Sequence, residues 1–168
     1  MATNKCMIRR MNELDWDRVS EIYIQGLETN LSTFQTECPS YEEWDASHLV
    51  DGRLVAVIED QVVGFASLAP TSKREIYRGV AEVSLYVDTG YKNCKIGTTL
   101  LRTLIVDSEK KGYWTLSSSI IAENVASIRV HERCGFRQIG YREKIAKDRF
   151  GRWRNTIMME KRSNLIMK

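Results

Sequence analysis

Several features that mark multi-domain or disordered chains are scarce in this sequence. Its 168 residues include two prolines, and no internal repeat, low-complexity segment or linker rich in Pro, Gly or Ser interrupts them. Apolar residues make up 43% and charged residues 28% of the chain, which is ordinary for a globular protein. We therefore expect one domain over residues 1–168, long enough to bury a sizeable core.

The sequence also lacks a long hydrophobic run and a strong excess of charge. No apolar stretch approaches the length of a membrane span, and residues 1–17 are polar and of mixed charge, unlike a signal peptide. The formal net charge is +3, with basic residues scattered in short groups such as Arg9-Arg10 and Lys110-Lys111. We expect a cytoplasmic protein whose partners include neither a membrane nor a nucleic acid.

Cysteine is present but not in a pattern that binds metal. The four residues lie far apart, with no close pair of the zinc-ligand type, at Cys6, Cys38, Cys94 and Cys134. They are typical of reduced thiols, and we expect no metal. The sequence shows no base near Cys94 that would favour a nucleophilic role.

Hydrophobic periodicity and turn signals divide the chain into strands and helices. Strands are predicted at 7–11, 53–58, 62–69, 80–87, 114–121, 136–145 and 155–160, and helices at 12–27, 41–50, 125–134 and from the loop after residue 91 to Gly112. This order predicts an α/β fold with one mixed sheet and helices on its faces. The core is expected over 7–160, and residues 161–168 as a loose tail.

The strand at 80–87 and the segment after it are the first sign of chemistry. The strand carries a carboxylate, Glu82, and leads through a polar, basic loop into an amphipathic helix. A loop that opens a helix presents unpaired backbone N–H groups to a phosphate. A base and an anion site this close point to group transfer from a phosphorylated cofactor, although an ordinary strand–loop–helix crossover has the same pattern.

Four stretches then carry a resemblance to a known family. They are FQTE at 34–37 with PSYEEW at 39–44, YRGVAEVSLYV at 77–87, KNCKIGT at 92–98 and NVASIRVHERCGF at 124–136. Together they resemble the GCN5-related N-acetyltransferase (GNAT) superfamily and, within it, the phosphinothricin N-acetyltransferase-like branch. The resemblance implies a single-domain GNAT fold with a mostly antiparallel sheet, which transfers acetyl from acetyl-CoA directly to an amine.

The resemblance also implies where acetyl-CoA is held. The backbone of Leu85, Tyr86 and Val87 would pair with the pantetheine arm as a strand does. Asn124 would bond the same arm, although an Asn before a helix is also typical of an N-cap. Backbone N–H groups at a helix N-terminus would hold the pyrophosphate; this segment comprises Asn93, Cys94, Lys95, Ile96, Gly97 and Thr98.

The pyrophosphate loop departs from the family pattern, which is Gln or Arg, two residues, Gly, one residue, then Gly or Ala. Lys92 replaces the first member, Lys95 stands where the first Gly belongs, and Gly97 is retained. Glycine permits close approach of the backbone to a phosphate, whereas a lysine must fold its stem away. We expect cofactor binding to survive in weakened form, with the ammonium adding some attraction.

The resemblance assigns Glu82 as general base and gives His131 a place beside the leaving thiolate. An amine must be neutral to attack a thioester, yet such amines are mainly protonated at pH 7, so a base assists. Burial would raise the pKa of Glu82 towards a useful range; a solvent-facing or salt-bridged Glu is the alternative. A lone histidine on a helix is otherwise more often structural.

The implied acceptor is the α-amine of a small molecule such as phosphinothricin, methionine sulfoximine or methionine sulfone. Such acceptors carry a carboxylate, so we expect an arginine clamp, with Arg74 and Arg78 as candidates. Phe34, Thr36 and Glu37 lie in the segment that resembles the substrate-covering loop.

Other functions stay open at this point. The acceptor is alternatively a polyamine, an aminoglycoside or a protein N-terminus, although the basic loop at 71–79 disfavours a cationic one. The third interpretation is a catalytically silent acyl-CoA-binding module. The presence of Glu82 and His131 disfavours this interpretation, whereas Lys95 favours it. Relatives of this branch commonly form homodimers, and Trp153 is a candidate for such a contact.

Overall fold

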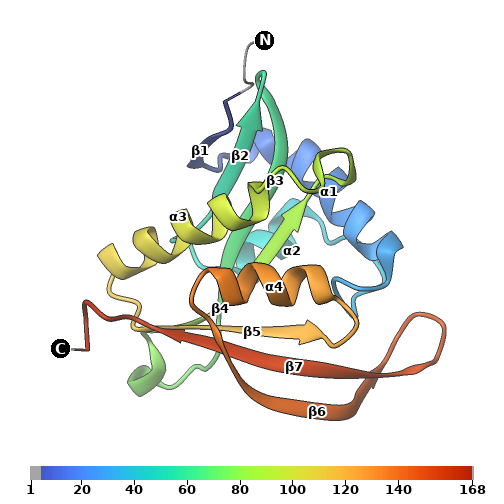
Figure 1. Ribbon diagram of the computed structural model, residues 1–168. Coiled ribbons are helices and arrows are strands. Elements are labelled where there is room, and N and C mark those ends of the chain that lie inside the picture. The colour runs from blue at the N-terminus through green and yellow to red at the C-terminus, as the bar shows by residue number, and fades with distance from the viewer. Residues whose placement is uncertain (1–4, 168) are drawn as a thin grey trace.

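A seven-stranded sheet runs through the protein in the order β1-β2-β3-β4-β5-β7-β6 (Figure 1). The structure is a computed structural model that describes residues 5–167. Neighbouring strands are antiparallel except β4 and β5, which are parallel, so the predicted mixed, mostly antiparallel sheet is confirmed. The strands are β1 (Met7–Arg10), β2 (Leu54–Ile58), β3 (Gln61–Pro70), β4 (Val80–Val87), β5 (Thr115–Ile121), β6 (Arg137–Lys147) and β7 (Trp153–Arg162).

Helices cover both faces of this sheet, as expected. In Figure 1, α3 and α4 lie in front of the strands and α1 and α2 lie behind them. Within residues 5–167, no helix is long and apolar enough to cross a membrane. The α-helices are α1 (Trp16–Thr29), α2 (Tyr41–Ser47), α3 (Ile96–Lys110) and α4 (Val125–Arg133), and short 3-10 helices span Glu13–Asp15, Glu75–Tyr77 and Thr89–Tyr91.

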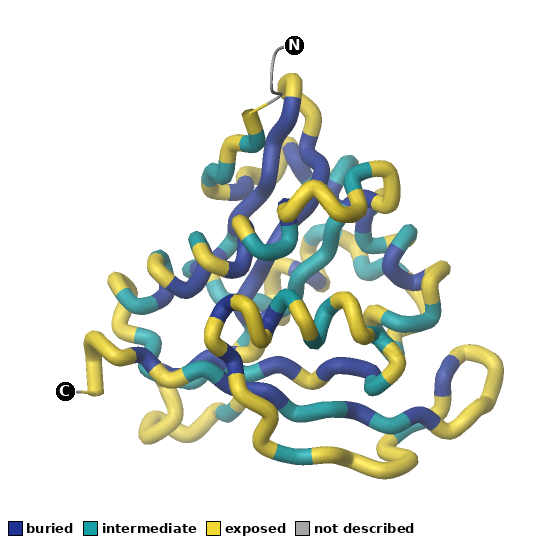
Figure 2. The backbone as a smooth tube through the Cα atoms, viewed as in Figure 1, coloured by how far each residue is buried: buried dark blue, intermediate teal, exposed yellow. Residues whose placement is uncertain are grey.

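The core has two parts, one on each face of the central strands. The larger part packs α3, through Leu100, Leu101 and Leu104, against the sheet. The smaller part lies under α1 and α2 and includes Trp44 and Phe65. Figure 2 shows the result: the central strands are buried, whereas β6 at the sheet edge is largely exposed. Burial of these apolar faces holds the helices on the sheet.

The parallel strands β4 and β5 pair over three residues and then separate. Val80, Ala81 and Glu82 lie opposite Thr115, Leu116 and Ser117. Beyond these pairs the two strands diverge, which is visible in Figure 1. Antiparallel pairing with β3 continues to Val87 and pairing with β7 to Ile121. The facing edges of residues 83–87 and 118–121 are therefore left without a neighbouring strand.

α2 ends at Ser47, three residues before the predicted end at residue 50. His48 is extended, and the Leu49 N–H donates to the Leu68 carbonyl of β3 at 2.8 Å. The Arg53 guanidinium donates to the carbonyls of Leu49 and His48, at 2.6 and 3.0 Å. These contacts draw the chain onto the sheet, so the helical pattern cannot continue.

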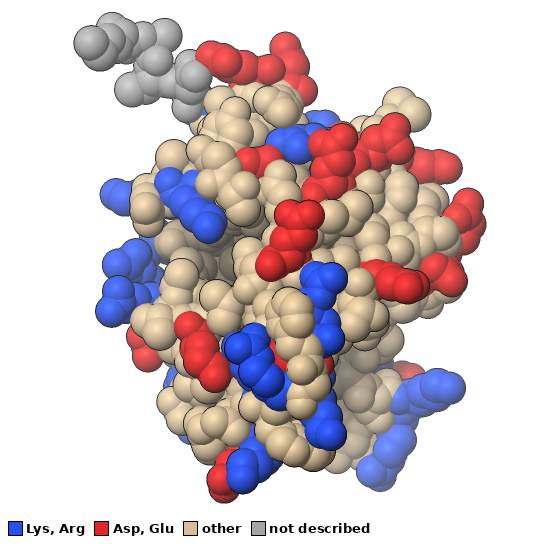
Figure 3. All heavy atoms as spheres, turned by 90° about the vertical axis from the view of Figure 1, so that its right-hand side faces the viewer, with Lys and Arg blue, Asp and Glu red and all other residues tan. Residues whose placement is uncertain are grey.

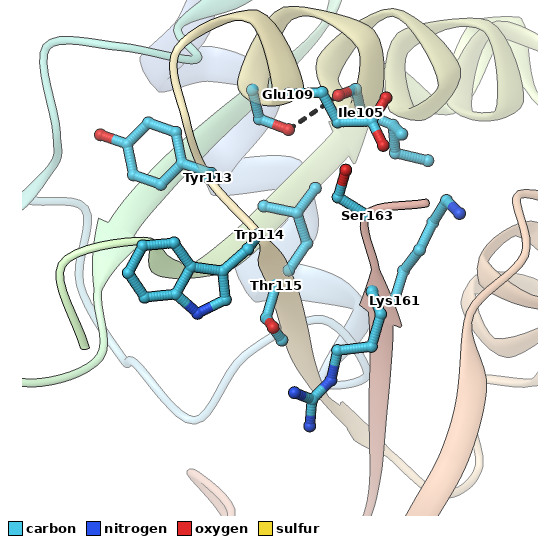
Figure 4. A pocket seen from close by; sticks show the side chains of 10 residues that line it. Ile105, Glu109, Tyr113, Trp114, Thr115, Lys161 and Ser163 are labelled. Atoms are coloured by element: carbon cyan, nitrogen blue, oxygen red, sulfur yellow. Dashed lines mark hydrogen bonds between the residues drawn. The ribbon is translucent and has the colours of Figure 1, made fainter. Parts of the chain in front are cut away.

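The last strand extends past the expected boundary at residue 160. Arg162 of β7 still lies opposite Thr115 of β5, and the Ser163 N–H donates to the Trp114 carbonyl at 2.9 Å. This part of the chain lines a cavity of about 10 Å³ beside α3 and β5. Figure 4 shows Lys161 and Ser163 at its wall. The prediction of a loose tail from residue 161 is wrong for residues 161–163, because backbone hydrogen bonds to β5 hold them.

A buried carboxylate fastens the β6–β7 hairpin to the end of α1. Asp148 accepts hydrogen bonds from the N–H groups of Phe150 and Arg152, from the Arg154 guanidinium at 3.1 Å and from the Asn30 amide at 2.9 Å. Burial alone would raise the pKa of Asp148, but these bonds outweigh it and hold the pKa well below its usual range. Asn30 caps α1, so this carboxylate connects two distant segments of the chain.

We predict that Asp148→Asn lowers the midpoint of thermal unfolding at pH 7. A carboxyl group with a depressed pKa stabilises the fold above its unfolded pKa of about 3.9, and this contribution is lost as the pH falls through the folded pKa. Melting curves of variant and wild type should therefore differ at pH 7 and converge as the pH falls below about 4. Glu143→Gln, an exposed change on β6, is the control; equal melting points of all three at pH 7 would contradict the prediction.

Candidate active site

A cavity of about 430 Å³ opens where β4 and β5 separate. Five segments line it, and their side chains are mainly small or polar. They are Leu31–Gln35 after α1, Glu82–Tyr86 of β4, Ser118–Ile121 of β5, Asn124, Ser127 and His131 around α4, and Arg142 of β6.

Glu82 projects into this cavity from the face of the sheet opposite α3. Its neighbours Ala81 and Val83 are buried in the core beneath α3, and alternate residues of a strand point to opposite faces. Burial of the carboxyl group among the cavity walls raises the pKa of Glu82, while the positive charge of Arg142 opposes this shift. The side chain is exposed to the cavity, so a raised pKa and access to a ligand coincide.

The N-terminus of α3 presents unpaired backbone N–H groups of the kind that bind an anion. The first hydrogen bond within this 15-residue helix runs from the Thr99 N–H to the Lys95 carbonyl at 3.0 Å. The N–H groups of Ile96, Gly97 and Thr98 therefore precede the helical ladder, and the helix dipole adds positive potential there. The Ile96 side chain is buried in the core, so this residue offers its backbone alone.

Lys95, where the family pattern has glycine, adopts a left-handed backbone. Its φ is +60°, and Asn93 two residues earlier has a φ of +64°. This conformation costs a residue with a Cβ about 1–2 kcal/mol relative to glycine. Lys95 is exposed to solvent. The glycine of the family is thus explained by backbone conformation as well as by approach to a phosphate.

Gly97 lies where the first turn of α3 approaches β4 and α4. A Cβ placed on it would lie 3.6 Å from Val87, 3.8 Å from Leu85 and 3.9 Å from Val130. These are ordinary contact distances, so side chains of β4 and α4 pack close to the first turn of α3.

The loop between β4 and α3 is fastened to α1. Asp88, directly after β4, is paired with the Arg18 guanidinium and accepts a hydrogen bond from the Gly90 N–H at 2.7 Å. The Gln25 side chain accepts a hydrogen bond from the Thr89 N–H at 2.9 Å. The position of the anion site is therefore set by helix α1 on the opposite face of the sheet.

His131 is buried in the last turn of α4 and lines the cavity beside Ser118. Its Nδ1 lies 2.8 Å from the Ser127 carbonyl and its Nε2 lies 2.9 Å from Ser118 Oγ. Because a carbonyl can only accept, we assign the hydrogen to Nδ1, and Nε2 then accepts from Ser118. Burial lowers the pKa of His131, so the ring is neutral at pH 7.

Asn124 caps α4 and also holds the wall of the cavity. Its side-chain oxygen accepts a hydrogen bond from the Ser127 N–H, and its amide donates to the Leu31 carbonyl, both at 3.2 Å. The N-cap interpretation is confirmed. The second bond ties the segment after α1 to α4, across the mouth of the cavity.

The structure brings only some of the residues that were predicted to bind the acceptor molecule to the cavity. Phe34 lines the cavity, whereas Thr36 and Glu37 lie outside its lining. Arg74 and Arg78 also lie outside it and are exposed on the loop before β4. Arg78 lies 3.6 Å from Glu75 and over the Trp114 ring.

Arg142 on β6 is the cationic residue that lines the cavity, and the sequence pattern did not single it out. Ser118 also lines the cavity, and it lies in a run of three serines at residues 117–119. Serines inside a strand are unusual and were the available signal. For Arg142 the sequence offered none, because β6 contains many charged residues.

Divergent parallel strands, an anion site at a helix N-terminus and a carboxylate facing the gap define an acyl-CoA-dependent transferase. In agreement, the model of the acetyltransferase (GNAT) family matches residues 13–136, and the chain belongs to this family. It is an acetyl-CoA-dependent N-acyltransferase of the phosphinothricin N-acetyltransferase-like branch.

Three relatives illustrate this placement. A phosphinothricin N-acetyltransferase from Alcaligenes faecalis is 29% identical, covering 98% of this chain and 86% of that protein. An L-methionine sulfoximine/L-methionine sulfone acetyltransferase from Pseudomonas paraeruginosa is 30% identical, covering 71% and 70%. The crystal structure of a ribosomal-protein-alanine N-acetyltransferase from Brucella melitensis has a TM-score of 0.84 at 31% identity, covering 94% and 99%.

We predict that Lys95→Gly stabilises the protein by about 0.5–1 kcal/mol, because glycine relieves the left-handed strain at some cost in unfolded-state entropy. Chemical denaturation measures this. Lys92→Gly is the matched control, since Lys92 has an ordinary φ of −59° and no strain to relieve. A Lys95→Gly protein no more stable than the wild type would refute the account.

Proposed function

We propose that this protein acetylates the primary amine of a small amino-acid-like molecule of the phosphinothricin, methionine sulfoximine or methionine sulfone type. The observation that carries the proposal is Glu82, a carboxylate of raised pKa that faces the gap between β4 and β5. The named activities of the relatives from Alcaligenes and Pseudomonas support the same substrate class.

The residues of this site fit acetyl-CoA, which supplies the acetyl thioester when bound. The N–H groups of Ile96, Gly97 and Thr98 would hold its pyrophosphate at the start of α3. The unpaired edge of Leu85–Val87 would pair with the amide groups of the pantetheine arm, as a strand does. Backbone N–H groups near Leu85 and Tyr86 would also donate to the thioester oxygen as negative charge develops there.

Glu82 would remove a proton from the ammonium group of the acceptor, directly or through water, which frees the lone pair on nitrogen. That nitrogen forms a bond to the thioester carbon as the carbon–sulfur bond breaks. The nitrogen gives up a second proton and the sulfur takes one up. One proton is therefore released for each amide formed.

His131 would act in this reaction as a positioning residue. Its Nε2 accepts from the Ser118 hydroxyl, which faces the cavity. The single hydrogen of this hydroxyl is used in that bond, so the Ser118 oxygen turns its lone pairs towards the cavity and would accept a hydrogen bond there, with His131 fixing its position. Direct proton donation by His131 is not favoured, because the donor nitrogen already bonds the Ser127 carbonyl.

A protein N-terminus is the second candidate acceptor. The structural relative from Brucella, whose name gives the alanine of a ribosomal protein as its target, is 31% identical. A peptide carries an amide where an amino acid carries a carboxylate, so a panel of acceptors separates the two proposals. Methionine sulfone, methionine sulfoximine and phosphinothricin should be acetylated far faster than an alanyl peptide or spermidine.

We also propose that two copies of the chain associate through the hairpin of β6 and β7. Edge strand β6 exposes Ile139, Tyr141 and Ile145, and Trp153 at the start of β7 is 56% exposed. An exposed apolar edge strand is prone to pairing with another chain. The molar mass of the protein in solution tests this proposal.

The cysteines bear on where the protein is located. All four are free thiols, which fits a reducing compartment such as the cytoplasm.

We predict that Glu82→Gln lowers kcat with methionine sulfone by about 10²–10⁴-fold, because the amide cannot accept a proton. The dissociation constant of acetyl-CoA should stay unchanged. A general base works only when ionised, so wild-type kcat should fall as the pH drops through the raised pKa of Glu82. The pH profile of Glu82→Gln should lack this fall in kcat.

Glu59→Gln, in the turn between β2 and β3, serves as the control and should match the wild type. Full activity of Glu82→Gln would remove Glu82 from the mechanism. A loss of acetyl-CoA binding equal to the loss of kcat would indicate that Glu82 has a structural role instead.

A further inference from the structure

Arg142 lies on the same face of the sheet as Glu82, three strands away along the chain of pairings. Glu82 is opposite Ser117 of β5, and Ile121 lies four residues further along that strand. Ile121 is opposite Thr156 of β7, which is opposite Arg142 of β6. Because directly paired residues share a face, and residues four apart on a strand do also, both charged side chains point to one side.

A bulge begins directly after Arg142. The pairing of β6 with β7 shifts between Arg142 and Ala146, and Lys144 within the shift has a φ of +48°. The Lys144 N–H donates to the Asn155 side-chain oxygen at 2.8 Å, which holds the bulge. Bulges beside functional sites redirect side chains, and here the last regularly paired residue lines the cavity.

The positive charge of Arg142 is available to a ligand. Within residues 5–167, no carboxylate lies within 4.0 Å of its guanidinium, whereas Arg18 and Arg154 each pair with two. It is the cationic residue among those that line the cavity. Its field reaches Glu82 across the cavity, where it opposes the rise in the pKa of that carboxyl.

We infer that Arg142 binds the carboxylate of the acceptor and selects α-amino acids over amines that lack one. A zwitterionic amino acid would place its ammonium at Glu82 and its carboxylate at Arg142, so each end meets an opposite charge. A guanidinium suits this task because it donates two parallel hydrogen bonds to a carboxylate. The inference rests on the proposed function, since it names the part of the same site that recognises the acceptor.

The test compares L-methionine sulfone with its carboxamide, which keeps the amine and removes the negative charge. In Arg142→Gln, the KM for methionine sulfone should rise about 10- to 100-fold, as for the loss of a charge-assisted pair. The KM for the carboxamide should change by less than about twofold, because the variant removes nothing that this substrate uses. Arg142→Lys should recover part of the affinity for the carboxylate.

Arg10→Gln is the control, because it removes an exposed arginine on β1 that lies outside the cavity lining. It should leave both KM values unchanged. Acetyl-CoA affinity and melting temperature, measured for each variant, establish that the protein is folded.

Three results would overturn the assignment of Arg142. These are an equal rise in both KM values for Arg142→Gln, no rise in either, or carboxylate discrimination that is lost in Arg78→Gln instead. Failure of the proposed function has a different signature, in which the wild type acetylates neither methionine sulfone nor its carboxamide but does acetylate a peptide or polyamine. The inference then falls with it.

Discussion

The separation of β4 from β5 after Glu82 and Ser117 is the constraint on which the rest of the site depends. Strands inside a sheet normally pair their backbone groups on both sides, and unpaired groups removed from water cost free energy. Here the facing edges of residues 83–87 and 118–121 stay open. A ligand with amide groups along an extended arm satisfies them, so the opening itself favours a pantetheine-like partner.

Each side of the opening is held by its outer neighbour. β3 pairs with β4 as far as Val87, and β7 pairs with β5 as far as Ile121. Ser118 is bonded to His131, which ties the β5 side to α4, and Arg18 ties the loop after β4 to α1. The gap is therefore bounded by two well-packed walls, which explains how backbone groups alone can position a ligand.

The sequence predicts local features well and side-chain direction poorly. The strand that carries Glu82, the N-cap at Asn124 and the loop that opens α3 depend on neighbouring residues, and the structure has each of them. Arg142 was missed because its direction depends on a pairing shift held by Asn155, a residue on another strand. Arg78 was selected by nearness in sequence to Glu82, yet the chain turns it towards Trp114.

The two charges in the cavity also affect each other. Burial raises the pKa of Glu82, and the unpaired charge of Arg142 works against that rise. A carboxylate bound to Arg142 would cancel much of this opposing field, because two opposite charges in contact act at a distance as a dipole. The pKa of Glu82 would then rise further, which makes it a stronger base when an amino acid is in place. In this arrangement the carboxylate of the acceptor offsets the field of Arg142, so binding of an amino acid itself strengthens the base that activates its amine.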